Sequence, residues 1–223
     1  MDRQLIIGNK NYSSWSLRPW LAMSKLGIPF EEIRVALYTP DTRARLQSFS
    51  PAGKVPVLRE GTTTIWDSLA ILEFLAETYP VLWPADRMTR AQARSLAAEM
   101  HSGFAALRSA MPMNCRASGR RITVTEPVQA DIARIQAIWE DCRKRFASDG
   151  PWLFGTFTAV DAMFAPVVTR FCTYGVETSP AVAEYMQTLL DDPAMQRWLA
   201  DANAETEIIE ASEVGIPNPG FFV

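Results

Sequence analysis

The chain has 223 residues, a formal net charge of −3 and 48% hydrophobic residues, so it is long enough for two small domains and too apolar to be disordered. Positive and negative side chains are mixed, which argues against broad electrostatic binding to nucleic acid or to an anionic membrane. No apolar run is long enough to span a bilayer, and the one at residues 5–7 is too short for a signal peptide, so we expect a cytoplasmic protein.

The first 80 residues predict strands and helices in the order β-α-β-α-β-β-α. Pro19 is expected in the first turn of the first helix, where its missing N–H costs little, and Gly27 ends that helix. Glu60-Gly61 between two short strands is a hairpin signal. The expected elements are a strand over residues 5–7, a helix over 15–26, a strand over 30–36, a helix over 41–49, strands over 55–58 and 62–66, and a helix over 67–79.

The strand pattern ends after residue 79, where a short segment with Pro80 and Pro84 begins. The tail from residue 205 to 223 contains two glycines and two prolines and is expected to be irregular. Between them, helical periodicity covers residues 87–111, 128–146, 158–174, 180–190 and 193–202. We therefore predict an α/β domain over residues 1–80, a linker over 81–86 and an all-helical domain over 87–223.

Three cysteines and one histidine limit the chemistry that the chain can carry. Cys115, Cys142 and Cys172 are odd in number, widely spaced and without a CxxC pair, which is typical of reduced, packed thiols rather than of a disulfide framework or a zinc site. His101 is the single histidine, so a histidine-based metal cluster is excluded and no metal is expected. A Ser-His-Asp triad would have to use His101, and no GxSxG motif accompanies it.

The first candidate site is the junction of the first strand and the first helix, where Tyr12, Ser13 and Ser14 stand. A helix N-terminus presents free N–H groups and a partial positive charge, which together stabilise an anion. A hydroxyl group at this point could donate to a thiolate or an oxyanion. The alternative is that Ser13 or Ser14 is only an N-cap of the helix.

The second candidate is Lys54-Val55-Pro56, at the start of a short strand. A proline there removes a hydrogen-bond donor from the sheet. One solution is a cis bond before Pro56, which would turn the N–H and C=O groups of Val55 outward. The alternative is an edge-strand proline with an ordinary trans bond.

The third candidate is Asp67-Ser68, which opens a helix directly after a strand. Asp67 could receive an amino group, and Ser68 with the helix N–H groups could receive a carboxylate. The alternative is a plain N-cap. A related pattern at Thr158 and Asp161 has the spacing of a capping box, and we assign Asp161 a structural role because it stands in a mostly apolar helix.

The expected helix over residues 87–111 carries an apolar stripe, which is usually core. Arg108 and His101 lie near this stripe and could reach a cleft. The basic cluster of Arg116, Arg120 and Arg121 is most often a solvated face. The stripe consists of Met100, Phe104, Leu107 and Met111.

In this order and at these spacings, the motifs resemble the glutathione transferase family over nearly the whole chain, except the tail. Residues 13–18 look like the serine motif of its zeta-type and bacterial members. Val55-Pro56 looks like the cis-proline of the family, and Asp67-Ser68 looks like its acidic-Ser pair for the γ-glutamyl end of glutathione. Thr158 with Asp161 looks like its C-domain capping box.

The resemblance implies a thioredoxin-like domain that binds glutathione, an all-helical domain and usually a homodimer. Ser13 is expected to activate the thiol, with Ser14 second and Tyr12 third. The expected glutathione-binding residues are Lys54, Val55, Pro56, Asp67 and Ser68, and those of the second-substrate pocket are Tyr12, Phe104, Arg108 and Met111.

Two positions refine the expected activity. Ser13 and Ser16 stand where thioredoxins carry CxxC, and because hydroxyl groups cannot exchange disulfides, thiolate activation is favoured over disulfide reduction. Trp15 stands where the zeta-type motif has cysteine, which argues against the maleylacetoacetate isomerase activity of that branch. We therefore predict a detoxifying glutathione transferase that conjugates glutathione to a small hydrophobic electrophile. The alternatives are a glutathione-dependent isomerase or dehalogenase, and a non-catalytic binding protein with this fold.

Overall fold

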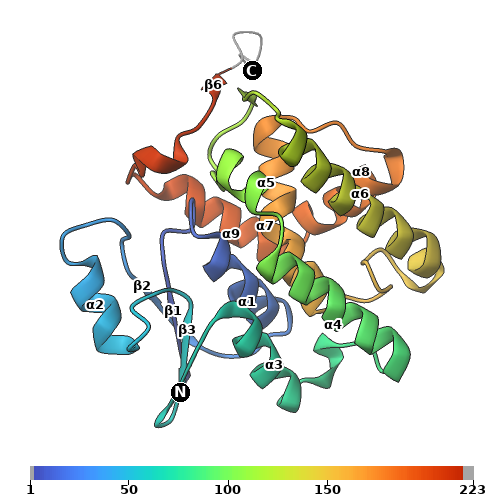
Figure 1. Ribbon diagram of the computed structural model, residues 1–223. Helices are drawn as coiled ribbons and strands as arrows, with labels where there is room; N and C mark the ends of the chain where they lie inside the picture. Colours follow the sequence, from blue (N-terminus) through green and yellow to red (C-terminus); the bar gives the residue numbers. More distant parts are fainter. Residues whose placement is uncertain (1–2, 218–223) are drawn as a thin grey trace.

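The strand β1 (Arg3–Ile7) lies inside a four-stranded sheet in the computed structural model, which describes residues 3–217. Apolar layers cover both faces of the sheet: Leu5 and Ile7 face one hydrophobic cluster, and Ile6 faces another. The strand order is β2-β1-β3-β4, with β2 parallel to β1, and with β1 and β3, and β3 and β4, antiparallel. This mixed sheet with its helices is the predicted thioredoxin-like domain (Figure 1).

The elements of this domain follow the predicted order. They are β1, α1 (Ser14–Lys25), β2 (Glu31–Arg34), α2 (Thr42–Phe49), β3 (Val57–Glu60), β4 (Thr63–Trp66) and α3 (Ser68–Thr78). The helix α1 begins at Ser14, so Pro19 is its sixth residue. Pro19 therefore lies in the second turn, whereas the first turn was predicted. Pro19 therefore leaves the carbonyl group of Trp15 without its usual helical donor.

The second domain is all-helical, as predicted, except for one short strand pair that was not predicted. Its elements are α4 (Arg87–Ser102), α5 (Ala105–Ala110), α6 (Glu126–Phe146), α7 (Ala159–Tyr174), α8 (Pro180–Leu190) and α9 (Pro193–Ala204), with 3₁₀ turns η1 (Pro80–Leu82), η2 (Ala147–Asp149) and η3 (Glu210–Ser212). The helix α6 begins two residues before the predicted start at residue 128, and Pro127 lies in its first turn.

The single helix predicted over residues 87–111 is wrong, because the chain breaks between α4 and α5. Phe104 adopts a left-handed conformation with φ of 58°, which a helix cannot continue through. Gly103 lies so close to α4 that a Cβ atom there would be 2.7 Å from the carbonyl oxygen of Glu99. The break turns α5 away from the axis of α4.

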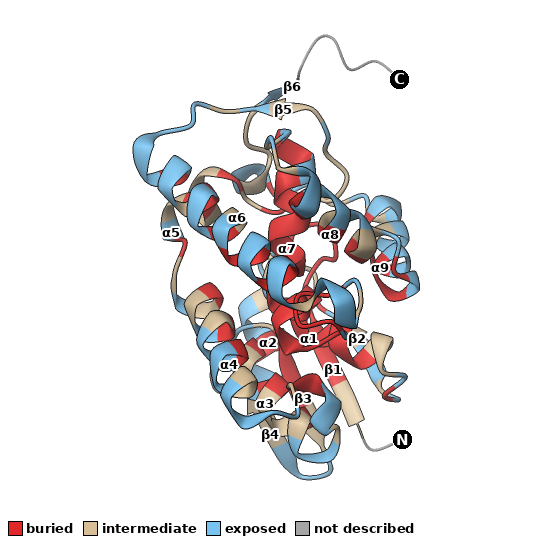
Figure 2. Ribbon diagram, turned by 90° about the vertical axis from the view of Figure 1, so that its right-hand side faces the viewer, coloured by how far each residue is buried: buried red, intermediate tan, exposed pale blue. Residues whose placement is uncertain are grey.

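The helix α7 is the centre of the molecule, and of its residues only Cys172 is exposed (Figure 2). It packs against α1 of the sheet domain and against α4 and α8 of its own domain. One hydrophobic cluster therefore joins the two domains, from Leu5 and Leu17 to Val160 and Phe164. The position of α1, and of the residues before it, is fixed by this shared core.

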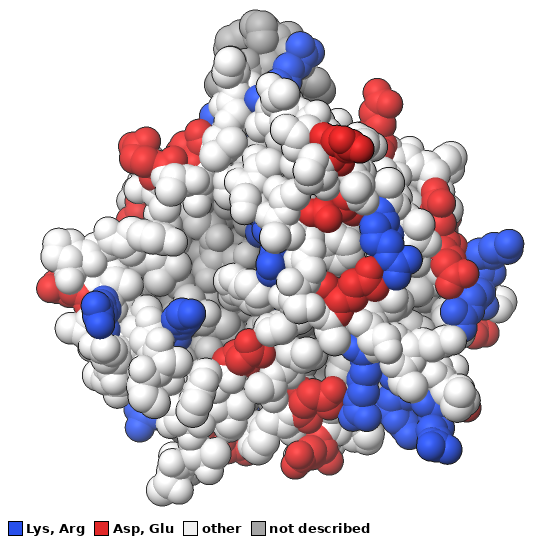
Figure 3. Space-filling model, in the orientation of Figure 1, with Lys and Arg blue, Asp and Glu red and all other residues white. Residues whose placement is uncertain are grey.

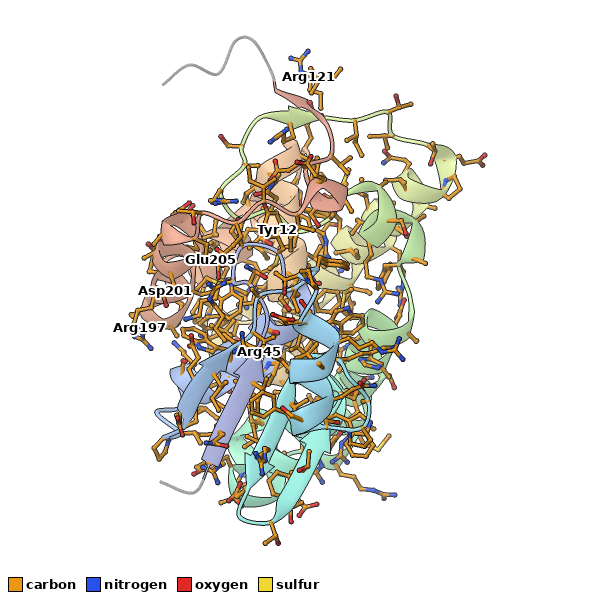
Figure 4. The ribbon with its side chains drawn as sticks, turned by 90° about the vertical axis from the view of Figure 1, so that its left-hand side faces the viewer. Tyr12, Arg45, Arg121, Arg197, Asp201 and Glu205 are labelled. Carbon is orange, nitrogen blue, oxygen red and sulfur yellow. The ribbon has the colours of Figure 1, made fainter. Side chains whose placement is uncertain are left out.

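The segment after α9 is tied to the sheet domain. The N–H groups of Lys10 and Asn11 donate to the carboxylate of Glu205 at 2.7 and 3.1 Å, and Figure 4 shows Glu205 and Tyr12 at the junction of the two domains. A short strand pair, β5 (Arg120–Arg121) with β6 (Ile216–Pro217), holds the end of this segment. The prediction of an irregular tail is thus only partly right, because the tail contains β6. Residues 218–223, which this prediction also covers, lie outside the described part.

The basic cluster was predicted to be a solvated face, and this prediction is wrong for Arg116 and Arg120. Arg116 donates to the backbone carbonyls of Glu205 and Glu207, and Arg120 pairs with Glu213 at 2.7 Å. Two arginines of the cluster thus fasten the tail, while Arg121 is exposed.

Two surveys of residues 3–217 limit the classes of site. No helix in this range has the length and apolar character needed to cross a membrane. The same range contains no group of three or more His, Cys, Asp or Glu side chains placed to hold a metal ion. Cys142 is buried, which raises the pKa of its thiol to about 12, whereas Cys172 is exposed and does not fit the prediction of packed thiols.

Candidate functional site

A cavity of ≈ 700 Å³ lies between the two domains, and we call it the interdomain cavity. Figure 3 shows Lys or Arg atoms at the rim of a hollow in this region. The cavity is lined by Tyr12, Ser13, Ser14, Trp15, Leu37, Tyr38, Thr39, Thr42, Arg43, Leu46, Gly53, Lys54, Val55, Arg108, Pro112, Met113, Arg170, Ile209 and Ser212.

A second cavity, of ≈ 520 Å³, adjoins the first, and we call it the α3 cavity. Trp15, Lys54 and Val55 line both cavities, so an extended ligand could pass from one into the other. The remaining residues that line the α3 cavity are Ala52, Pro56, Trp66, Asp67, Ser68 and His101. The structure thus brings together all the predicted glutathione-binding residues and the predicted catalytic serines.

Ser13 is the N-cap residue of α1, but its hydroxyl group makes no capping hydrogen bond. It donates instead to the hydroxyl oxygen of Ser16 at 2.7 Å, and this oxygen also accepts the N–H of Gly8 at 3.0 Å. The hydroxyl group of Ser13 therefore does not satisfy a backbone N–H of α1, and Ser13 lines the interdomain cavity at the positive end of this helix.

Ser14 and Tyr12 line the same cavity, but their surroundings differ. Ser14 is partly exposed in the first turn of α1. The hydroxyl group of Tyr12 donates to Glu213 at 2.7 Å and accepts from Arg116 at 2.9 Å. Burial, and then Glu213, raise the pKa of Tyr12, so its proton is held by the tail rather than offered to the cavity.

The peptide bond between Val55 and Pro56 is cis, which confirms the prediction. Pro56 precedes β3, and Lys54 and Val55 border both cavities. The backbone at Val55 therefore lies where the two cavities meet.

Asp67 is the N-cap residue of α3 and a cavity residue at once. Its Oδ1 atom accepts the N–H groups of Leu69 and Ala70 at 2.9 and 3.2 Å. Its Oδ2 atom lies 3.2 Å from Nε2 of His101. Ser68 is buried, and its hydroxyl oxygen accepts from Arg18 at 3.4 Å. The structure thus gives Asp67 the simple capping role and also leaves its charge facing the α3 cavity.

Two arginines lie against the ring of Trp15, and a third, Arg170, lines the same cavity. The guanidinium carbons of Arg18 and Arg108 lie 4.3 and 5.4 Å from the centre of its ring. Burial, together with the charges of Arg170 and Arg108, lowers the pKa of Arg18 to about 9. Burial, followed by the charge of Arg108, lowers the pKa of Arg170 to about 10. Both guanidinium groups still carry their charge at neutral pH.

Two residues predicted for the second-substrate pocket do not reach either cavity. Phe104 and Met111 are buried in the hydrophobic core, and Pro112 and Met113 line the interdomain cavity instead. The broken helix explains the difference, because it turns the stripe of α4 and α5 inward.

Arg170 was not predicted from the sequence as a residue of the site, although it lines the interdomain cavity. The only signal was a charged residue in the strongly apolar helix α7. Ser16 was noted only for its spacing from Ser13, and the hydrogen bond between them was not anticipated.

Asp161 has the predicted structural role. It is fully buried, and its carboxylate accepts the N–H groups of Thr158 at 2.8 Å and Leu153 at 3.0 Å. The capping box with Thr158 is present, and Asp161 borders neither cavity. It joins the loop before α7 to the helix itself.

Residues 12–78 match the family model described as Glutathione S-transferase, N-terminal domain, and residues 125–201 match the one described as Glutathione S-transferase, C-terminal domain. A protein of a Ralstonia species named maleylpyruvate isomerase is 30% identical over 184 residues, which are 78% of this chain and 77% of that protein. The chain belongs to the glutathione S-transferase family.

Two further similar proteins match less of the chain or match it at lower identity. A Caenorhabditis elegans protein named probable maleylacetoacetate isomerase is 35% identical over 94 residues, and this chain spans 44% of its length. The crystal structure of a glutathione transferase homologue from Burkholderia GL BGR1 with bound glutathione is 24% identical, with a TM-score of 0.69, and covers 92% of this chain and 99% of that one. This likeness confirms the fold.

Proposed function

We propose that this protein binds glutathione across the two cavities and holds its thiolate at Ser13 for attack on a small electrophile. The observation that carries the proposal is that Ser13 lines the interdomain cavity at the start of α1, with a hydroxyl group that makes no capping hydrogen bond. The thiol of free cysteine has a pKa of about 8.5. Lowering it by about two units requires roughly 2.7 kcal/mol, which one hydrogen bond to a charge and a helix N-terminus can supply.

In this proposal the glutathione molecule runs from the α3 cavity into the interdomain cavity. Asp67 receives its amino group, and the hydroxyl and N–H groups of Ser68 receive the γ-glutamyl carboxylate, since the next two N–H groups of α3 already donate to Asp67. The backbone of Val55 holds the cysteinyl part where the two cavities meet. This places the thiol beside Trp15 and within reach of Ser13.

The thiolate sulfur then forms a bond to an electrophilic carbon. In conjugation the product leaves with glutathione attached. In the second candidate function, an isomerisation, the carbon–sulfur bond breaks again and glutathione is returned. Relatives named maleylpyruvate isomerase and maleylacetoacetate isomerase favour this second candidate, whereas Trp15 in place of cysteine argues against it.

Two measurements test the proposal. Titration of the protein with glutathione should show binding, and the ultraviolet absorbance of the thiolate should appear at lower pH for bound than for free glutathione. Turnover of electrophiles with a count of free thiol then separates conjugation, which consumes glutathione, from isomerisation, which does not. Binding without a shifted thiolate would favour a non-catalytic binding protein. We also propose that the protein is a cytoplasmic homodimer and that it has a detoxifying role.

A further inference from the structure

We propose that the electrophile carries a carboxylate, which Arg108 and Arg170 bind in the interdomain cavity. The inference rests on the proposed function for the place of the thiolate. It concerns the side of the cavity formed by the helical domain, since Arg108 is in α5 and Arg170 is in α7.

The charged side chains that line the interdomain cavity, among the described residues, are all positive. Arg43, Lys54, Arg108 and Arg170 line it, and no Asp or Glu is among the described residues that do. Glu213 lies behind Tyr12, where Arg120 pairs with it. The carboxylate of Glu213 is thus paired outside the cavity, and no acid among the described lining residues balances its positive charge.

Among the four cations that line the interdomain cavity in the described region, Arg170 is the buried one. It is 4% exposed, and its Nε atom donates to the carbonyl oxygen of Met111 at 2.8 Å. Its Nη1 atom is buried and has no partner within residues 3–217. A buried guanidinium group without a counter-ion is costly, and a carboxylate offers two oxygens in the geometry that a guanidinium fork matches.

Arg108 completes the pair from the other helix. Its Nη1 atom donates to the carbonyl oxygen of His101 at 3.2 Å, and its guanidinium carbon lies 5.4 Å from the centre of the Trp15 ring. This contact places the positive charge of Arg108 beside the position proposed for the thiolate. A flat, unsaturated electrophile could therefore lie on Trp15 with its carboxylate on the two arginines.

The carboxylates of glutathione itself do not explain this pair. The proposed contacts of glutathione, at Val55, Asp67 and Ser68, are all in the sheet domain. Arg43 and Lys54 are cations of the same domain and lie on that side of the cavity. Arg108 and Arg170 are left for the second substrate.

The test uses 4-chloro-3-nitrobenzoate and its neutral counterpart 4-chloro-3-nitrobenzamide. In both, the glutathione sulfur bonds to the carbon that carries chlorine, the carbon–chlorine bond breaks and chloride leaves. After correction for the uncatalysed rates, we expect kcat/KM to favour the benzoate by about tenfold or more, mainly through KM. Arg108→Met should bring the ratio of kcat/KM for benzoate over benzamide close to one, and because both reactions use the same thiolate, any effect of the lost charge on the thiolate cancels in this ratio.

Arg197→Met is the matched control, because Arg197 is exposed on α9 and lies at the outer edge of the molecule in Figure 4. It removes the same charge and should keep the preference. Arg170→Met also removes the bond to Met111, so its folding is checked by circular dichroism, and Arg108→Met carries the test without it. Loss of the preference in Arg197→Met would show a general field effect and overturn the inference.

Calorimetric titration of both compounds into the protein without glutathione separates the inference from the proposed function. If neither compound is turned over but the benzoate binds and Arg108→Met abolishes its binding, the proposed function fails and the anion site stands. Equal binding of benzoate and benzamide by the parent protein would overturn the anion site, whatever the turnover. So would a change of glutathione affinity in Arg108→Met as large as the change of benzoate affinity.

Discussion

The hydroxyl oxygen of Ser13 lies 2.7 Å from that of Ser16, which also accepts the N–H of Gly8. Ser16 is fully buried, so this contact fixes the side chain of Ser13 from behind. If Ser13 turns its proton toward a thiolate, Ser16 can donate its own proton to the oxygen of Ser13. The two serines can therefore act as a short chain of hydrogen bonds that ends at the bound sulfur.

Ser13→Ala is expected to remove most of the thiolate stabilisation. The acidic limb of the pH profile of kcat/KM should move upward, toward the free thiol value of about 8.5, while the affinity for glutathione changes far less. Tyr12→Phe should leave the limb in place, because the hydroxyl group of Tyr12 is bound to Glu213.

Ser14→Ala is the matched control for this change, because Ser14 lines the same cavity one residue later. If the limb moves in Ser14→Ala or Tyr12→Phe but not in Ser13→Ala, the role passes to that residue. If it moves in none of the three, the N-terminus of α1 alone stabilises the thiolate or no thiol is activated.

Ser16→Ala is expected to move the same limb by a smaller amount, since Ser13 keeps its proton but loses its support. The double variant should move the limb no further than Ser13→Ala does, because the two residues act as a unit. The lost partner of the Gly8 N–H should lower the free energy of unfolding by about 1–3 kcal/mol. A lower stability with an unchanged pH profile would give Ser16 a structural role alone.

The sheet domain could be predicted from the sequence because its signals are local. Short apolar runs, the Glu60-Gly61 turn and the capping residue Asp67 each act within a few residues. The cis bond before Pro56 was predicted from the resemblance and from the position of this proline, and it is present. The boundaries at residues 80 and 87 stay predictions.

The second-substrate side could not be predicted in the same way, because it depends on which face of a buried helix meets the cavity. The helical pattern around Phe104 gives no sign of its left-handed backbone, so the inward turn of Met111 was missed. In α7 nearly every position is buried, and periodicity therefore cannot show that Arg170 faces a cavity. The contacts of Arg116 with the tail join segments far apart in sequence and have no local signal.

Asp67→Asn is expected to weaken glutathione binding without weakening the fold. Asparagine is a good N-cap and tolerates a positive φ, which is 78° at this residue, so the change removes the charge and keeps the cap. We expect the apparent Kd of glutathione to rise about tenfold and the KM of the electrophile to stay nearly constant.

Asp86→Asn is the control for this change, because Asp86 caps α4 in the same way through the N–H of Thr89 but borders neither cavity. It should leave glutathione binding unchanged. A rise in the KM of the electrophile with constant glutathione affinity in Asp67→Asn would place the γ-glutamyl end elsewhere.

Asp161→Ala is expected to impair folding more than catalysis. Its carboxylate accepts the backbone N–H groups of Leu153 and Thr158, and loss of a helix cap costs about 0.5–2 kcal/mol. Chemical denaturation should show the lower stability, and kcat/KM of the folded fraction should stay near that of the parent. An inactive variant as stable as the parent would make Asp161 a residue of the site.

The pH dependence of this loss tests which force dominates at Asp161. Burial raises its pKa from 3.8 to about 6, although the hydrogen bonds from Leu153 and Thr158 act in the opposite direction. A raised pKa in the folded state means that the protonated form favours folding, so the contribution of Asp161 to stability is full below pH 3.8 and is lost as the pH rises through about 6. The free energy of unfolding of the parent minus that of Asp161→Ala should therefore be larger at pH 4.5 than at pH 7.5, by roughly 2 kcal/mol. Other titrating groups cancel in this difference. If the difference instead grows with pH, the backbone hydrogen bonds outweigh burial, and Asp161 stabilises the fold as an ionised cap.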